Sequence, residues 1–151
     1  MEVSTRQIGF KNLEYTLSAL PIIPYLKLEG FATDGVQWEK ASVSTTKIGA
    51  DGKSVVNTKP TLYTATFSLL PTSNARMALD SLVNATTAKF GKPLLDYSVV
   101  LSVNNYTTSS KTVYSGGAIE EADAGDSANL DDGQGNKQYK LVFTDRVILP
   151  L

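Results

Sequence analysis

Residues 61–70 read TLYTATFSLL, and this stretch decides the fold class. Apolar and hydroxyl side chains alternate along it, with Tyr63, Ala65, Phe67 and Leu69 at the apolar positions. A period of two is typical of a β-strand that buries one face. Pro71 follows, and proline ends a strand because it has no N–H to donate. The stretch therefore predicts a strand with one face against a hydrophobic core.

A single helix is predicted directly after this strand, over about residues 73–90. Ser73 or Asn74 can cap its first turn, because a side-chain oxygen there accepts from a free backbone N–H. Apolar positions recur at helical spacing and place one face of the helix on the core: Leu79, Leu82, Val83, Thr86 and Phe90. Gly91 and Pro93 end the helix, and Arg76 and Asp80 form an i,i+4 charge pair.

Further strands are predicted on both sides of this helix. Alternating patterns before it give two hairpins within the first forty residues, with Asp34-Gly35 as a turn. Residues 97–103, 111–114 and 139–144 supply strands after it, and residues 147–149 continue the last one. Strands joined by short turns around one helix indicate an α+β fold, mainly antiparallel. We expect one domain, 1–151, built as a β-sandwich or flattened barrel with the helix across it.

Residues 41–59 differ from the rest of the chain. Asp51-Gly52 is a strong tight-turn signal, because such a turn needs residues that tolerate positive φ. The flanking arms favour β-structure but contain little core material: Val43, Ile48, Val55 and Val56. A long hairpin that projects from the body is therefore predicted. The alternatives are a mobile surface hairpin and an ordered functional extension, and long excursions favour the second.

The composition excludes several kinds of chemistry. The chain has no histidine and no cysteine, so catalytic triads, thiolate metal sites and disulfides are not available. The formal net charge is −1 and no basic cluster stands out, which argues against a duplex-binding surface. No apolar run approaches the length of a membrane helix, and the start of the chain lacks the pattern of a signal peptide. We expect neither enzymatic activity nor a cofactor.

An acidic stretch is the one chemical peculiarity of the sequence. Between Ser115 and Gln138, six carboxylates stand against Lys137: Glu120, Glu121, Asp123, Asp126, Asp131 and Asp132. A calcium loop is one interpretation, but the spacing does not match the EF-hand pattern. A catalytic pair is disfavoured because no apolar surroundings would raise a carboxyl pKa. A solvated loop, or a surface kept negative towards a polyanion or a neighbouring subunit, remains.

Two other patterns have a structural and a functional interpretation. Gly116-Gly117 and the glycines at 133 and 135 resemble phosphate loops, yet neither lies between a strand and a helix, so turns are favoured. Aromatic residues at strand positions could stack on sugars or bases: Tyr15, Tyr25, Trp38, Tyr63, Tyr97 and Tyr114. Aromatics at such positions more often belong to a core or an interface.

Three blocks in order resemble the tail-tube proteins of bacteriophages. They are KIGADGK at 47–53, TLYTATFSLLPTSN at 61–74 and ALDSL at 78–82. The resemblance covers about the central third of the chain: a hairpin tip, a Thr-rich strand and a capped helix. The segment around Pro21 and Pro24 and the acidic stretch depart from it.

This resemblance implies a virion protein that polymerises as stacked hexameric rings around a channel for DNA ejection. The partners it implies are further copies of the chain, baseplate and terminator proteins, and a sheath if the tail contracts. Before assembly the subunit would be in the host cytoplasm, without insertion into a membrane. The implied inter-subunit hairpin comprises Val43, Lys47, Ile48, Asp51, Gly52, Lys53, Val55, Val56 and Lys59. Some of the acids in the acidic stretch would then face the lumen or its rim: Glu120, Glu121, Asp123, Asp126, Asp131 and Asp132.

Two other functions stay open. A related ring protein, for example of a secretion system, would share the fold. A soluble β-sandwich that binds carbohydrate would instead use the aromatic residues. Self-assembly into rings or tubes separates the first group from the second.

Overall fold

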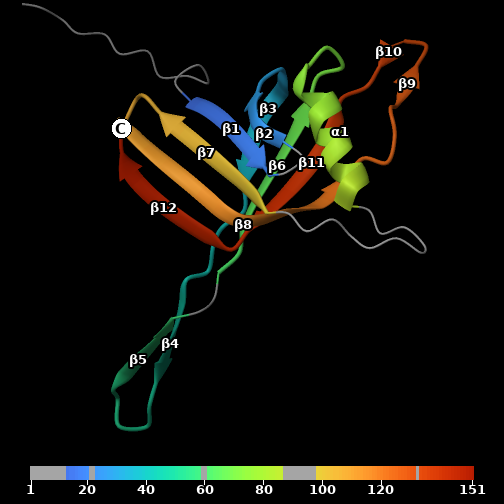
Figure 1. Ribbon diagram of the computed structural model, residues 1–151. Helices are drawn as coiled ribbons and strands as arrows, with labels where there is room; N and C mark the ends of the chain where they lie inside the picture. Colours follow the sequence, from blue (N-terminus) through green and yellow to red (C-terminus); the bar gives the residue numbers. More distant parts are fainter. Residues whose placement is uncertain (1–12, 21–22, 59–60, 87–97, 132) are drawn as a thin grey trace, which may run out of the picture.

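The computed structural model describes residues 13–20, 23–58, 61–86, 98–131 and 133–151 (Figure 1). The fold is α+β and mainly antiparallel, with one α-helix among the described residues. The elements are β1 (Leu13–Ala19), β2 (Ile23–Leu28), β3 (Phe31–Trp38), β4 (Ser44–Ile48), β5 (Ser54–Thr58), β6 (Tyr63–Leu69), α1 (Ala75–Thr86), β7 (Val99–Asn105), β8 (Ser110–Ala122), β9 (Ala128–Asn129), β10 (Gly133–Gln134), β11 (Lys137–Phe143) and β12 (Asp145–Pro150).

The main sheet has eight strands in the order β2-β1-β7-β8-β11-β6-β3, with β12 also paired to β8. Strand β8 is shared between two halves. Its first part pairs with β7 and β12, and its last part pairs with β11. The sheet folds over along β8, so the two halves face one another and α1 lies beside them, as Figure 1 shows. This is the flattened sandwich with one helix that the sequence predicts.

Two glycines permit the bend in β8. Gly116 has a φ of +62°, in the left-handed region that favours glycine. A Cβ atom on Gly117 would lie 2.8 Å from the carbonyl oxygen of Val99 and still closer to the ring of Phe143. The prediction of a turn at Gly116-Gly117 is therefore wrong. These residues lie within one long strand, at the place where close approach of the neighbours requires the absence of a side chain.

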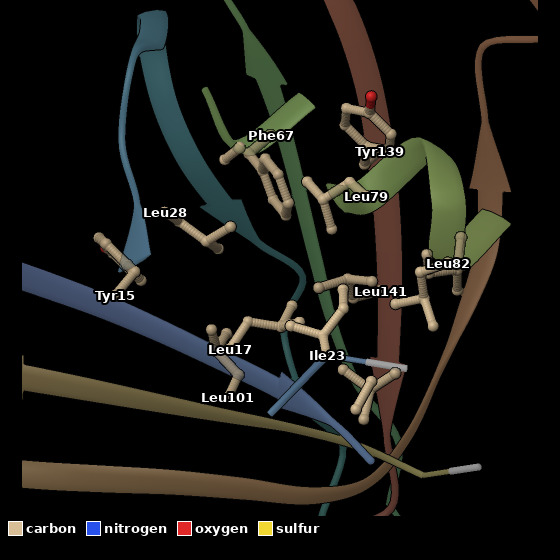
Figure 2. Close-up of a cluster of buried hydrophobic side chains, with 14 of the residues drawn as sticks. Tyr15, Leu17, Ile23, Leu28, Phe67, Leu79, Leu82, Leu101, Tyr139 and Leu141 are labelled. Carbon is tan, nitrogen blue, oxygen red and sulfur yellow. The ribbon is translucent and has the colours of Figure 1, made fainter. Parts of the chain in front are cut away.

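The core lies between the two halves of the sheet and α1 (Figure 2). Strand β6 contributes as predicted, with Ala65, Phe67 and Leu69 almost completely buried. Other side chains come from every layer and are also buried: Leu17, Leu28, Leu79, Leu82, Leu101, Tyr139 and Leu141. Alternation along the strands and the 3–4 spacing along the helix both place these residues on the inner faces.

The helix begins at Ala75 and ends at Thr86 in the described part of the chain. Its cap is confirmed at Ser73, whose Oγ accepts a hydrogen bond from the backbone N–H of Ala75 at 3.3 Å. The predicted continuation to Phe90, Gly91 and Pro93 lies outside the described residues. Within the described segments, no helix is long and apolar enough to span a membrane.

Two local predictions are wrong because partners distant in the sequence decide them. Asp34-Gly35 is not a turn: both residues lie inside β3, where the register with β6 shifts between Phe31 and Val36. At this irregularity residues 32–35 of β3 stand opposite Ser68 alone, and Gly35 has a positive φ of +63°. Arg76 and Asp80 do not pair with each other. Arg76 binds Asp126, and Asp80 binds Lys137.

Candidate assembly surface

The β4–β5 hairpin projects from the body of the protein (Figure 1). The two strands form a separate sheet and pair only with each other among the described strands. The tip is closed by the N–H of Gly49, which donates to the carbonyl of Lys53 at 2.8 Å, and by positive φ at Gly52. The carboxylate of Asp51 accepts from the N–H of Lys53 at 3.1 Å. The Asp-Gly turn predicted from the sequence is thus formed.

The hairpin has two chemically different faces. Directly paired residues share a face in an antiparallel pair. Thr46 lies opposite Val56 and Ile48 opposite Ser54, so Ile48 and Val56 share one face. Lys47 lies opposite Val55 on the other. Ile48, Val55 and Val56 are 77%, 55% and 64% exposed. Exposed apolar side chains gathered on one element are typical of an interaction surface. Lys59 lies outside the described residues.

An aromatic cluster lies at the root of this hairpin, the place where the end of β3 leads into it and the start of β6 leads out of it. Trp38, at the end of β3, stacks on Tyr114 of β8 with ring centroids 4.3 Å apart. Tyr63, at the start of β6, meets Tyr114 edge-on at 6.0 Å. The guanidinium of Arg146 lies 4.8 Å above the ring of Tyr63, a cation–π contact. The two chain segments that lead into and out of the hairpin are therefore fixed to the body next to each other.

Two hydrogen bonds, one between backbone groups and one from a side chain, join the same two chain segments next to the aromatic cluster. The N–H of Glu39 donates to the carbonyl of Thr64 at 3.1 Å. The hydroxyl of Thr61 donates to the carbonyl of Ser42 at 2.9 Å. Together with the aromatic cluster, these contacts set the direction in which the hairpin leaves the sheet.

The edges of the main sheet are open to other chains. Strands β2 and β3 end the strand order, and β12 pairs with β8 on one side only. Every residue of β12 is exposed, although the strand is apolar at Val147, Ile148 and Leu149. An exposed apolar edge strand is a template for pairing with another chain. The molecule therefore presents both an edge and a hairpin that lack partners among its described residues.

A network of charges joins the acidic stretch to the helix. Asp80 Oδ1 accepts from the hydroxyl of Tyr139 at 2.6 Å and lies 2.8 Å from the Nζ of Lys137. Arg76 pairs with Asp126 at 2.8 Å, and Lys137 lies 3.9 Å from the same carboxylate. The side chains of Arg76 and Lys137 are only 8% and 10% exposed, so these two cations depend on their partners.

Burial and hydrogen bonding raise the pKa of several tyrosines. Desolvation, together with the hydrogen bond to Asp80, raises the pKa of Tyr139 far above its usual value. Burial likewise raises the pKa of Tyr15 and of Tyr114, although the guanidinium of Arg146 opposes the rise at Tyr114. These groups are neutral at physiological pH and belong to the structure of the body.

The six acids of the sequence pattern do not share one environment. Glu120 and Glu121 lie in β8, and Glu120 is 3.6 Å from the Nζ of Lys140. Asp123 accepts from the N–H of Gln138 at 2.9 Å, and Asp126 binds Arg76. Asp131 is exposed on the β9–β10 segment, and Asp132 lies outside the described residues. No group of three or more acids in the described segments could hold a metal ion.

Sequence reasoning identified the hairpin but missed its root. The sequence pattern predicts Trp38, Tyr63 and Tyr114 only as members of a larger set of aromatics for stacking, a core or an interface. Three strands distant in the sequence bring these three together. Tyr15 lies elsewhere, buried against Phe31, and Tyr97 is outside the described residues. The pairing of Arg76 with Asp126, fifty residues apart, had no local signal either.

Solved structures that resemble this chain come from the anti-feeding prophage and from an extracellular contractile injection system. The cap that terminates the tube of the anti-feeding prophage matches with a TM-score of 0.57 and 11% identity over 100% of this chain and 96% of that one. The sheath/tube terminator of the extracellular contractile injection system PVC matches with a TM-score of 0.55 and 10% identity, over 97% and 99%. A chain of the PVC sheath–tube complex gives 0.52 and 10%, over 91% and 88%. At such identities the likeness establishes a shared fold.

The chain thus shares its fold with chains of the anti-feeding prophage and of the PVC contractile injection system. A family model described as "Tail fiber protein gp32" matches residues 6–147, and the chain belongs to this family. It is a phage tail-related protein. A search of curated protein sequences gives no match.

Proposed function

We propose that the chain is the tube subunit of a phage tail, and that its copies close into rings which stack around a DNA-conducting channel. In this proposal six copies form each ring, the subunit has a structural and not an enzymatic role, and it is located in the virion. Its partners are other copies of itself and the tail components that meet the ends and the outside of the tube.

The projecting hairpin is the observation that carries this proposal. An isolated two-stranded hairpin is at best marginally stable in water. The β4–β5 arms nevertheless expose Ile48, Val55 and Val56 and leave their backbone edges unpaired in the described part of the chain. Pairing with a neighbouring copy would cover both the apolar side chains and the backbone groups. A contact between two different surfaces of identical subunits builds a ring if the rotation between them closes, and an open filament if it does not.

The open edges of the sheet support the ring. Strand β12 exposes Val147, Ile148 and Leu149, and β2 lies at the other end of the same half of the sheet. Joining the β12 side of one copy to the β2 side of the next would continue the sheet around an axis. A closed sheet has no edges left, which removes the risk of uncontrolled pairing.

Electron microscopy of the purified full-length protein tests the proposal. The expected result is hollow tubes, or rings with a central channel, with a regular axial repeat. Size-exclusion chromatography provides the complement, because a tube subunit elutes as large species. A protein that stays monomeric at all concentrations and forms neither rings nor tubes would overturn the proposal.

A fibre subunit is the second candidate, because the description of the family names a tail fibre. The same micrographs separate the two. A fibre subunit gives thin solid rods of defined length without a channel, whereas a tube subunit gives hollow cylinders whose length varies in the absence of other tail proteins.

We further propose that the acidic stretch lies at the lumen or its rim. Asp126 and Glu120 are engaged by cations of the same chain, but Glu121 and Asp131 are exposed and form no ion pair among the described residues. Carboxylates near the channel would repel phosphate groups and limit adhesion of passing DNA.

A further inference from the structure

A hollow on the described surface lies between the start of β1 and the β2–β3 turn. It has a volume of about 550 Å³, and Tyr106 closes one side. Leu13 and Phe31 give it apolar walls. Two carboxylates, Glu14 and Glu29, border it, with Lys27 as the single basic residue in the lining. The hollow therefore suits a ligand that presents an apolar group together with positive charge.

Contacts to the body hold this hollow open in one shape. The hydroxyl of Ser73 donates to the carbonyl of Glu29 at 2.5 Å, and the N–H of Leu70 donates to the carbonyl of Gly30 at 2.8 Å. A side chain at Gly30 would lie within 2.7 Å of the Cβ of Ser73. On the opposite side, Tyr106 donates to Glu14 at 2.6 Å. Because these contacts already order the walls of the hollow, binding there costs little conformational entropy.

The hollow and the β4–β5 hairpin lie at opposite ends of the molecule. In Figure 1 the β2–β3 turn is at the top of the body, and the hairpin extends from its bottom. A hairpin of this chain therefore does not reach its own hollow. A second copy stacked in the same orientation can place its hairpin there, and each added copy presents the same two ends again.

From these observations we propose that the hollow bordered by Glu14, Glu29 and Tyr106 is the receptor for the β4–β5 hairpin of a second copy. This inference rests on the proposed function and adds the surface that receives the hairpin. Ile48 and Val56, on one face of the hairpin, pack against the apolar walls. Lys53, in the turn at the tip of the hairpin, forms no ion pair among the described residues and approaches Glu29 and Glu14.

Crosslinking with introduced cysteines tests the contact, because the natural chain has no cysteine to interfere. The test variant carries Ile48→Cys on the hairpin and Thr33→Cys beside the hollow. A short bis-maleimide is used, since a direct disulfide would demand a Cα–Cα distance of about 4.4–6.8 Å. The matched control carries Ile48→Cys with Leu130→Cys, a fully exposed residue between β9 and β10. Each single-cysteine variant is treated in parallel.

The expected result is a ladder of covalent oligomers for the Ile48–Thr33 pair and none for the Ile48–Leu130 pair or the single variants. A charge exchange gives an independent measurement. Glu29→Lys alone should raise the concentration needed for assembly by roughly two- to fivefold, and adding Lys53→Glu should reverse this.

The outcomes separate this inference from the proposed function. Normal tubes without a ladder for the Ile48–Thr33 pair, or with a ladder only for the control pair, overturn the receptor assignment and leave the tube intact. A parent protein that forms no tubes or rings overturns both.

Discussion

The indole of Trp38 stacks on the phenol of Tyr114 with the ring planes only 22° apart. The contact joins the last residue of β3 to the middle of β8, and so ties the root of the projecting hairpin to the strand that both halves of the sheet share. An aromatic pair of this kind stabilises a fold by roughly 0.5–1.5 kcal/mol beyond its burial. Its position gives it a second consequence, since it orients the hairpin.

Trp38→Ala is therefore expected to affect both stability and assembly. The free energy of unfolding should fall by at least roughly 0.5–1.5 kcal/mol, as measured by denaturant titration followed by circular dichroism. The concentration needed for assembly should rise as well. Trp38→Phe keeps an aromatic ring and should retain most of both properties. An alanine variant that assembles like the parent would show that the root does not orient the hairpin.

Replacing residues 48–55 with a short Gly-Ser turn should leave a folded body that no longer polymerises. The hairpin contributes no residue to the core cluster, so the thermal midpoint should change little. Light scattering and electron microscopy report the loss of assembly. A substitution of Leu130 by serine, elsewhere on the exposed surface, provides the control. Normal tubes from the shortened variant would show that assembly does not need the hairpin, and would refute the proposed contact.

Removing the carboxylate of Asp80 should destabilise the body. Lys137 would lose its closest partner while its side chain stays buried, which costs roughly 1–3 kcal/mol because Asp126 remains 3.9 Å away. Asp145→Ala, on an exposed strand, should change the free energy of unfolding by less than about 0.5 kcal/mol. Adding Lys137→Met to Asp80→Ala removes the unpaired charge and should recover part of the loss. If the double variant is no more stable than Asp80→Ala, the ion pair is not the cause.

Stability should fall at alkaline pH because folding holds Tyr139 neutral. Its pKa is raised in the folded protein, so the folded state retains a proton that the unfolded state releases above about pH 10. The stabilisation is complete below that pH and declines as the pH rises further, by up to about 1.4 kcal/mol per unit for one group. Tyr139→Phe should flatten the decline in denaturant titrations above pH 10. Equal slopes for both proteins would contradict this linkage.

Charge reversal of the exposed acids tests the rim proposal. Glu121→Lys with Asp131→Lys should make assembled tubes retain DNA at low salt, and the retention should weaken steeply as salt increases. Met77→Lys is the control, because it adds a positive charge on the exposed face of α1, outside the acidic stretch and the proposed contacts between copies. Retention equal to that of the Met77→Lys tubes would place the acids away from the DNA path.

The sequence by itself determined the parts of the molecule that depend on near neighbours. Alternation in residues 61–70 predicted β6, and the Asp-Gly turn predicted the hairpin, since both depend on the local pattern of side chains and on permitted φ angles. The Ser73 cap also needs only the first turn of the helix. The antiparallel sandwich with one helix followed from the order of these elements.

Tertiary structure alone decided the features that join distant segments. Pairing with β6 places Asp34-Gly35 at an irregularity inside β3 and not at a turn between two strands. Close neighbours of Gly117 keep the glycine pair inside β8. Arg76 pairs with Asp126 because the fold brings the acidic stretch to the helix. The stacking of Trp38 on Tyr114 and the hollow beside Glu14 arise in the same way. Local patterns fix backbone conformation, but only the packed chain determines which side chains meet.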